Sequence, residues 1–162
     1  MGLLNAFKRH GYGPDIWNIG DDNAFIGVFT GRIGQKCHYG AQMEALSNAE
    51  RTFYIAQQLE MEVNNGGFGQ FFNNGSGAFS GEIAEVFRRI GANHTAAICE
   101  RALSILDVDP AKAGDESARI ARLNQLPADA FSECDEAFYR YDDDLTALGC
   151  KYIRRNRNSF NV

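Results

Sequence analysis

Apolar residues recur every three or four positions along most of this sequence, and this spacing constrains the fold more than any other feature. The clearest segment begins at Ser47, which forms a capping-box pattern with Glu50. Its apolar face carries Ala49, Phe53, Ala56, Leu59 and Val63. Asn65 and Gly66 then tolerate the left-handed conformation of a helix end, so we expect a helix from Ser47 to about Asn65.

Six further segments show the same pattern. Ser80 and Asn93 are placed to cap two of them, and Gly91 is placed to end the first. Ser132 and Asp135 repeat the capping-box spacing before a third. The expected helices cover 23–36, 80–90, 93–106, 116–123, the segment after Ser132, and the segment from Asp142 to the C-terminal arginines. Short connections between them predict an all-α fold, a single compact domain of about six or seven helices.

The N-terminal part of the sequence is less regular. Residues 1–21 contain four glycines and a proline, which predicts an irregular N-terminal arm, with Trp17 and Ile19 packing it against an all-helical domain over 22–162. Three glycines lie within 23–36, and each costs a helix interior about 1 kcal/mol relative to alanine. A strand over the letters AFIGVFT is therefore the alternative for that segment.

Charge is unevenly distributed along the chain. The 16 basic and 21 acidic residues give a net charge of −5, which disfavours nonspecific binding to phosphate backbones. Residues 129–150 hold seven acids and one arginine, whereas the last twelve residues hold four bases, Lys151, Arg154, Arg155 and Arg157. Acids at a helix start and bases at its end fit the helix dipole, while nucleic-acid binding by these bases is the alternative.

The cysteines and the chain start indicate the compartment. Cys37, Cys99, Cys134 and Cys150 are widely separated and form no CxxC pair. The first ten residues lack the pattern of a signal peptide, and no apolar run approaches the roughly 20 residues of a membrane span. We expect reduced, mostly buried thiols in a cytoplasmic protein without a membrane segment, a metal or a cofactor.

The segment 60–79 has the most unusual composition, with four asparagines, five glycines and four phenylalanines. One interpretation is a rigid, hydrogen-bonded corner after a helix, with Phe68, Phe71 and Phe72 folded onto the core. The other is a polar pocket lined by Asn64, Asn65, Gln70 and Asn73. Both remain open, because neither interpretation identifies a nucleophile or a proton shuttle.

Recognisable catalytic patterns are missing from the sequence. It contains neither a GxSxG elbow nor a GxxxxGK[ST] loop, and it has no HExxH motif. Glu60 and Glu62 are two positions apart on a helix and therefore lie on different faces. We expect no enzymatic activity and no catalytic residues.

A family resemblance rests on the run LSNAERTFYIAQQLEMEVNNGGFGQFFNNGSG, followed by an amphipathic helix ending in RRIGA. This part resembles a bacterial family, described as a domain of unknown function, that includes a DNA-mimic protein reported to bind a transcription factor in place of DNA. The letters DEAFYRYDDDLTALGCKYIRRN are similar to the family's C-terminal part. The resemblance covers roughly residues 22–160 and implies an all-helical fold. Its signature residues are Glu62, Val63, Asn64, Asn65, Gly66, Gly67, Phe68, Gln70, Phe71 and Asn73.

DNA mimicry requires carboxylates spread over a broad face, because the basic groove of the partner accommodates such a charge array. The candidate acidic face consists of Asp129, Glu133, Asp135, Glu136, Asp142, Asp143 and Asp144. We therefore expect a non-enzymatic protein-interaction domain whose partner is a protein, with a transcriptional regulator as the candidate that the resemblance implies. The alternative is a small-ligand-binding protein or an enzyme with its site at residues 64–74.

Overall fold

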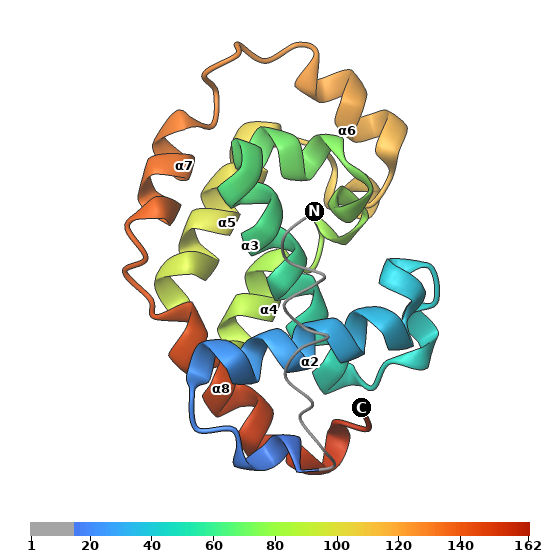
Figure 1. Cartoon of the computed structure of the whole chain (residues 1–162). Helices are drawn as coiled ribbons and strands as arrows, with labels where there is room; N and C mark the ends of the chain where they lie inside the picture. The colour runs from blue at the N-terminus through green and yellow to red at the C-terminus, as the bar shows by residue number, and fades with distance from the viewer. Residues whose placement is uncertain (1–14) are drawn as a thin grey trace.

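The computed structural model describes residues 15–162, and within this range the chain forms seven α-helices, six short 3-10 helices and no strand (Figure 1). The α-helices are α2 (Asp22–Lys36), α3 (Asn48–Asn73), α4 (Ile83–Ile90), α5 (Asn93–Leu106), α6 (Glu116–Leu123), α7 (Ser132–Tyr139) and α8 (Leu145–Arg155). The 3-10 helices are η1 (Ile16–Asn18), η2 (His38–Gly40), η3 (Met43–Ala45), η4 (Gly75–Phe79), η5 (Pro110–Lys112) and η6 (Arg157–Ser159). The prediction of an all-α fold is confirmed. None of these helices is long and apolar enough to span a bilayer.

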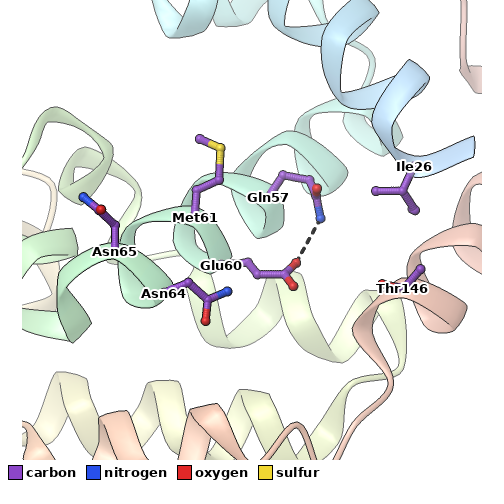
Figure 2. Close-up of a pocket in the computed structure, with 7 residues that line it drawn as sticks. All are labelled: Ile26, Gln57, Glu60, Met61, Asn64, Asn65 and Thr146. Atoms are coloured by element: carbon purple, nitrogen blue, oxygen red, sulfur yellow. Dashed lines mark hydrogen bonds between the residues drawn. The ribbon is translucent and has the colours of Figure 1, made fainter. Parts of the chain in front are cut away.

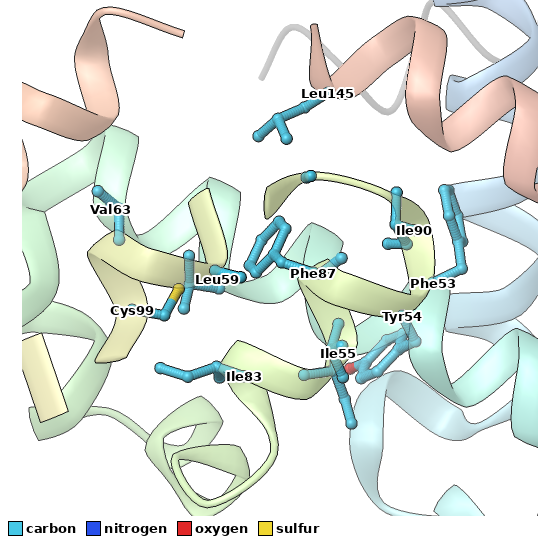
Figure 3. Packing of buried hydrophobic residues seen from close by; sticks show 14 of the residues in the cluster. Phe53, Tyr54, Ile55, Leu59, Val63, Ile83, Phe87, Ile90, Cys99 and Leu145 are labelled. Carbon is cyan, nitrogen blue, oxygen red and sulfur yellow. The ribbon is translucent and has the colours of Figure 1, made fainter. Parts of the chain in front are cut away.

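The long helix α3 runs through the middle of the fold and contacts α2, α4, α6, α7 and α8 (Figure 1). Its predicted capping box is present, because Ser47 Oγ accepts from the Glu50 N–H and the Glu50 carboxylate accepts from the Ser47 N–H. Leu59 of α3 is fully buried in the same cluster as Phe87 of α4 and Cys99 of α5 (Figure 3). The central helix α3 therefore forms the common packing surface for these five helices.

Residues 22–36 form a helix, so the alternative of a strand is wrong. Asp21 caps α2 by accepting a hydrogen bond from the Ala24 N–H at 2.7 Å. The helical spacing of Phe25, Phe29 and Ile33 buries all three side chains completely. Burial of this stripe outweighs the low helix propensity of the glycines.

The predicted N-terminal arm lies mostly outside the described residues, which begin at Asp15. Ile19 is buried, and the Trp17 ring packs edge-on against Phe29 with a centroid distance of 5.0 Å. Residues 15–21 are therefore held against α2, as Trp17 and Ile19 predicted. The division of the chain at residue 21 stays a prediction.

Three predicted caps are wrong, although the helices themselves are present. The Ser80 hydroxyl donates to the Gly77 carbonyl oxygen, and α4 begins three residues later. Asn93 is the first residue of α5 and follows Ala92, the cap position. Ser132 lies inside α7 and makes no capping bond, because α7 begins directly after Phe131. The predicted stop at Gly91 is confirmed, since its φ of 97° is left-handed.

The four cysteines are all buried and none forms a disulfide, as predicted. Burial raises the pKa of the Cys99 thiol and raises that of Cys150 to about 12. A thiol is nucleophilic only as the thiolate. These side chains therefore act as apolar core residues.

A buried ion pair fastens the C-terminal end of the chain to α2 and α3. Glu50 is fully buried and accepts from Lys36 Nζ at 2.8 Å. The same carboxylate accepts from the N–H of Asn161 at 2.8 Å. Burial by itself would raise the pKa of Glu50, but the bonds from Lys36, Ser47 and Asn161 outweigh it and leave the pKa lowered.

Replacing Glu50 by glutamine should lower the free energy of unfolding at neutral pH by about 2 kcal/mol, because it removes the charge of a buried carboxylate that accepts bonds from Lys36, Ser47 and Asn161. A folded-state pKa below the ordinary value of 4.5 stabilises the fold above that value. The difference between wild type and E50Q should therefore shrink as pH falls through the lowered pKa. Urea unfolding of both proteins between pH 7 and pH 3 measures this, with Glu44→Gln, an exposed site on η3, as the control. An equal effect of the two substitutions would contradict the prediction.

Candidate functional site

The central helix α3 is interrupted at two glycines in its second half. Gly66 has an extended backbone with φ −164°, and Gly67 is left-handed with φ 76°. The helix resumes at Phe68 and continues to Asn73. The predicted helix end near Gly66 is therefore a break inside a longer helix, and the predicted corner is helical on both sides of it.

Asp135 of α7 occupies the space beside this break. Its Oδ1 accepts a hydrogen bond from the N–H of Phe68, the first residue after the break, at 2.8 Å. A Cβ atom on Gly67 would lie 2.5 Å from Asp135 Oδ2, so the contact requires glycine for space as well as for its φ. Burial raises the pKa of Asp135, and the bond from Phe68 offsets only part of that rise.

The phenylalanines after the break pack into the core, as the sequence predicted. Phe68, Phe71 and Phe72 are fully buried. The Phe68 ring meets Phe138 of α7 edge-on at 6.0 Å, and the Phe72 ring lies 5.3 Å from Phe131. The second part of α3 is thus held against α7 by aromatic contacts as well as by Asp135.

The polar residues of this segment do not converge on one pocket. Gln70 donates to Glu62 Oε2 at 2.6 Å, and the same carboxylate accepts from Asn74 and Ser76. Asn73 is exposed, whereas Asn64 and Asn65 border a groove on α3 that Gln70 and Asn73 do not line. Gln70 therefore belongs to a hydrogen-bonded network, and Asn64 and Asn65 are the two residues of the predicted pocket that the groove brings together. Their role as binding residues stays a prediction.

That groove, of about 400 Å³, lies between α2, α3 and the first turn of α8 (Figure 2). Gln57, Glu60 and Asn64 extend from α3 toward the side on which Thr146 of α8 lies. The sequence did not point to Gln57, Glu60 or Thr146 as site residues, because Thr146 is more than eighty positions away from the other two. The groove is lined by Ile26, Gln57, Glu60, Met61, Asn64, Asn65 and Thr146.

Glu60 is held in place by neutral hydrogen-bond donors. Its Oε1 accepts from the Tyr141 hydroxyl at 3.0 Å and its Oε2 accepts from Gln57 Nε2 at 3.2 Å. Asn64 Nδ2 in turn donates to the Tyr141 oxygen at 2.6 Å. Burial raises the pKa of Glu60, since these bonds do not fully replace its hydration. Glu60 and Glu62 belong to separate networks, as their spacing predicted.

The predicted acidic residues fall into two groups. Asp143 accepts from both the N–H and the hydroxyl of Thr95 at 2.8 and 2.9 Å, and Asp144 caps α8 through the Ala147 N–H at 2.9 Å. With Asp135, these residues bind other parts of the chain. The other group, Asp129, Glu133, Glu136 and Asp142, is exposed and makes no such bond to any described residue, and Asp144 is exposed as well although it caps α8.

Two of the exposed acids lie on α7. Glu133 and Glu136 are three positions apart on this helix, so they share its outer face, whereas Asp129 lies in the turn that precedes it. None of the three forms an ion pair within residues 15–162. Asp142 lies 3.6 Å from Arg140, which adds one positive charge at the end of this face.

The basic residues near the C-terminus are partly used in packing. Arg154 donates to the Ile19 carbonyl at 3.0 Å and lies over the Phe25 ring at 4.1 Å. Arg157 lies over the Trp17 ring at 4.7 Å. Asp144 caps α8 and Arg154 and Arg155 lie in its last turn, which fits the interpretation from the helix dipole. The first turn of α8 holds no acid, since Asp142 pairs with Arg140 and Asp143 bonds Thr95. Within residues 15–162, no group of three or more metal-binding side chains is present.

The fold and the site define an all-helical domain whose broken central helix carries a polar groove beside an acidic helix. A sequence model described as DMP19-like protein matches residues 44–156, and the chain belongs to this family. Comparisons with curated proteins and with solved structures gave no match.

Replacing Gly67 by alanine should destabilise the fold by at least about 2 kcal/mol, because the new Cβ atom meets Asp135 and the residue must keep a positive φ. Gly69 is the matched control, since its Cβ position is 3.8 Å from the nearest atom, on Phe131. Gly69→Ala should be neutral or stabilise by up to about 1 kcal/mol. Thermal and urea unfolding measure both variants, and similar losses would contradict this role of Gly67.

Replacing Asp143 by alanine should lower the free energy of unfolding by about 1–2 kcal/mol, since Thr95 loses an acceptor in the first turn of α5. Asp142→Ala changes the same charge one position earlier at an exposed site. Its effect should stay within about 0.5 kcal/mol. Urea unfolding distinguishes the two, and an equal effect would mean that charge matters more than the hydrogen bonds to Thr95.

Proposed function

We propose that this chain is a non-enzymatic protein-interaction domain that binds a DNA-binding protein through the outer face of α7. The observation that carries the proposal is the row formed by Glu133 and Glu136 on α7 with Asp129 in the turn before it, all three exposed and unpaired within the described residues. Membership of the DMP19-like family, which includes a DNA mimic, supports the same direction.

The geometry of the row suits a partner with a basic groove. Glu133 and Glu136 are three apart on α7, so their Cβ atoms are about 5–6 Å apart, and Asp129 adds an exposed carboxylate in the turn before the helix. Such a group of negative charges attracts the lysine and arginine side chains that normally contact phosphates. Asp142 adds a carboxylate after the helix, although Arg140 neutralises part of its charge.

Small-ligand binding is the second candidate function. The groove beside Asn64 and Asn65 favours it, because a concave site with a few polar groups is the usual form of a ligand pocket. A ligand site there would use the same side of the molecule as Tyr141, which lies between α7 and α8.

The α7 face is tested by capturing partners from native cell lysate at low and physiological salt and then titrating the purified partner. The expected partner is a DNA-binding protein whose own DNA competes with this chain. Binding should weaken as salt rises, because exposed charges are screened. The triple variant Asp129→Asn, Glu133→Gln, Glu136→Gln should reduce affinity by roughly tenfold or more at low salt.

A charge-matched control separates the α7 face from net charge. Glu44, Glu85 and Glu116 are exposed acids on η3, α4 and α6, and replacing all three by glutamine removes the same charge. This control should change affinity by less than about twofold. If both triple variants weaken binding equally, or if DNA does not compete, the proposed use of α7 is wrong.

A further inference from the structure

We propose that the groove between α2, α3 and α8 binds a guanidinium or alkylammonium group through the carboxylate of Glu60. This site is separate from the α7 face and does not depend on it. The ligand is defined by its chemistry, a cationic group that donates several hydrogen bonds and is carried on a flexible alkyl chain.

A comparison with Glu50, which is also on α3, shows that Glu60 lacks a cationic partner among the described residues. Glu50 has Lys36 at 2.8 Å, and its carboxylate is stabilised in the charged form. Glu60 receives only neutral donors, from Tyr141 and Gln57, and no lysine or arginine within residues 15–162 pairs with it. The charge of Glu60 is therefore less compensated than that of Glu50, as its raised pKa also indicates. A cation entering the groove would supply the missing partner.

The other residues of the groove fit such a cation. Thr146 lines it with a hydroxyl that accepts no hydrogen bond from any described residue, and Asn64 adds an amide whose nitrogen already donates to Tyr141. These oxygens can accept from the N–H groups that the carboxylate does not engage. Ile26 and Met61 form apolar walls, and such walls suit the methylene chain of a lysine or arginine side chain.

Tyr141 fixes the direction of the carboxylate. It is left-handed with φ 49°, a rare conformation for a non-glycine residue. Its ring packs against Phe138 at 5.7 Å, and its hydroxyl bonds both Glu60 and Asn64. Strained backbone of this kind concentrates at binding sites, where the surrounding structure maintains it. Glu60 is thus oriented toward the groove before any ligand arrives.

The cation can come from a free small molecule or from a side chain of a protein partner. Met61, Tyr139 and Tyr141 are 54, 47 and 40% exposed, and all three lie on or bond to residues 60–64 of α3. Exposed tyrosine and methionine are enriched in protein interfaces. Because of this composition, the experiment must compare an arginine-containing peptide with a small cation.

The test is a titration of the full chain with agmatine at pH 7.5, in which NMR spectra of isotopically labelled protein record the chemical shifts of the amide groups. Saturable shifts should be centred on Glu60, Asn64 and Thr146, and N-(4-hydroxybutyl)urea, a neutral counterpart of agmatine that lacks both cationic groups, should bind at least tenfold more weakly. Glu60→Gln should weaken agmatine binding at least tenfold, whereas Glu62→Gln, which removes the same charge two positions away, should change it less than threefold. Thr146→Val is a second variant with the same shape and should weaken binding at least threefold.

Several results would overturn the assignment. These are the absence of saturable shifts, equal binding of the neutral counterpart, and unchanged agmatine affinity in Glu60→Gln. Lys8 and Arg9 are cations in the part of the chain that the structure does not describe, so the titration is repeated on a chain with both replaced by glutamine. If agmatine binds this variant tenfold more tightly, Lys8 or Arg9 competes for the groove, and the proposal of a ligand from outside the chain is wrong. Unchanged agmatine binding supports a ligand from outside the chain.

The source of the cation is decided by comparing butylguanidinium with the peptide acetyl-Gly-Arg-Gly-amide, since each carries one positive charge. Tighter binding of the peptide assigns the groove to an arginine of a protein partner, and tighter binding of butylguanidinium assigns it to a free cation. The triple variant Asp129→Asn, Glu133→Gln, Glu136→Gln should bind agmatine like the wild type. Failure of the α7 proposal and failure of the groove proposal are then distinguishable.

Discussion

The hydrogen bond from the Phe68 N–H to Asp135 caps the second half of the central helix and ties it to α7. A helix interrupted at Gly66 and Gly67 begins again with N–H groups that lack intrahelical acceptors, and such a start needs a cap. Asp135 supplies it from α7, which places α7 against the second half of α3 and brings Phe138 onto Phe68. The position of α7, and of the turn that leads from it to α8, follows from this contact.

Asp143 repeats the same device at the start of α5. That helix has no side-chain cap of its own, and Asp143 accepts from Thr95 in its first turn. Both carboxylates lie in a stretch whose composition suggested surface charge, yet both are partly buried and serve other helices. The chain therefore uses one acidic segment for two purposes. Inward carboxylates fix the arrangement of helices, and the outward row on α7 remains available to a partner.

The helices were predictable because their signals are local. The stripe of Phe25, Phe29 and Ile33 and the capping box at Ser47 each lie within a few turns of one helix. The break in α3 was missed because glycine after asparagine usually indicates the end of a helix. The helix resumes only because Asp135 accepts from the Phe68 N–H, and these two residues are 67 positions apart in the sequence. Asn64 and Asn65 were predicted as binding residues, while Glu60 needed Tyr141, 81 positions away, to be recognised.

The segment 140–144 connects the two proposed surfaces. Arg140 and Asp142 lie at the end of the α7 face, Tyr141 reaches the groove, and Asp143 and Asp144 hold α5 and α8. Consecutive residues thus contact different helices. The left-handed backbone at Tyr141 makes this possible because it turns the chain locally. A partner that covers α7 would lie near this turn, because Arg140 and Asp142 flank Tyr141, and a cation at Glu60 would lie near the Tyr141 hydroxyl. The turn would therefore be close to both proposed ligands.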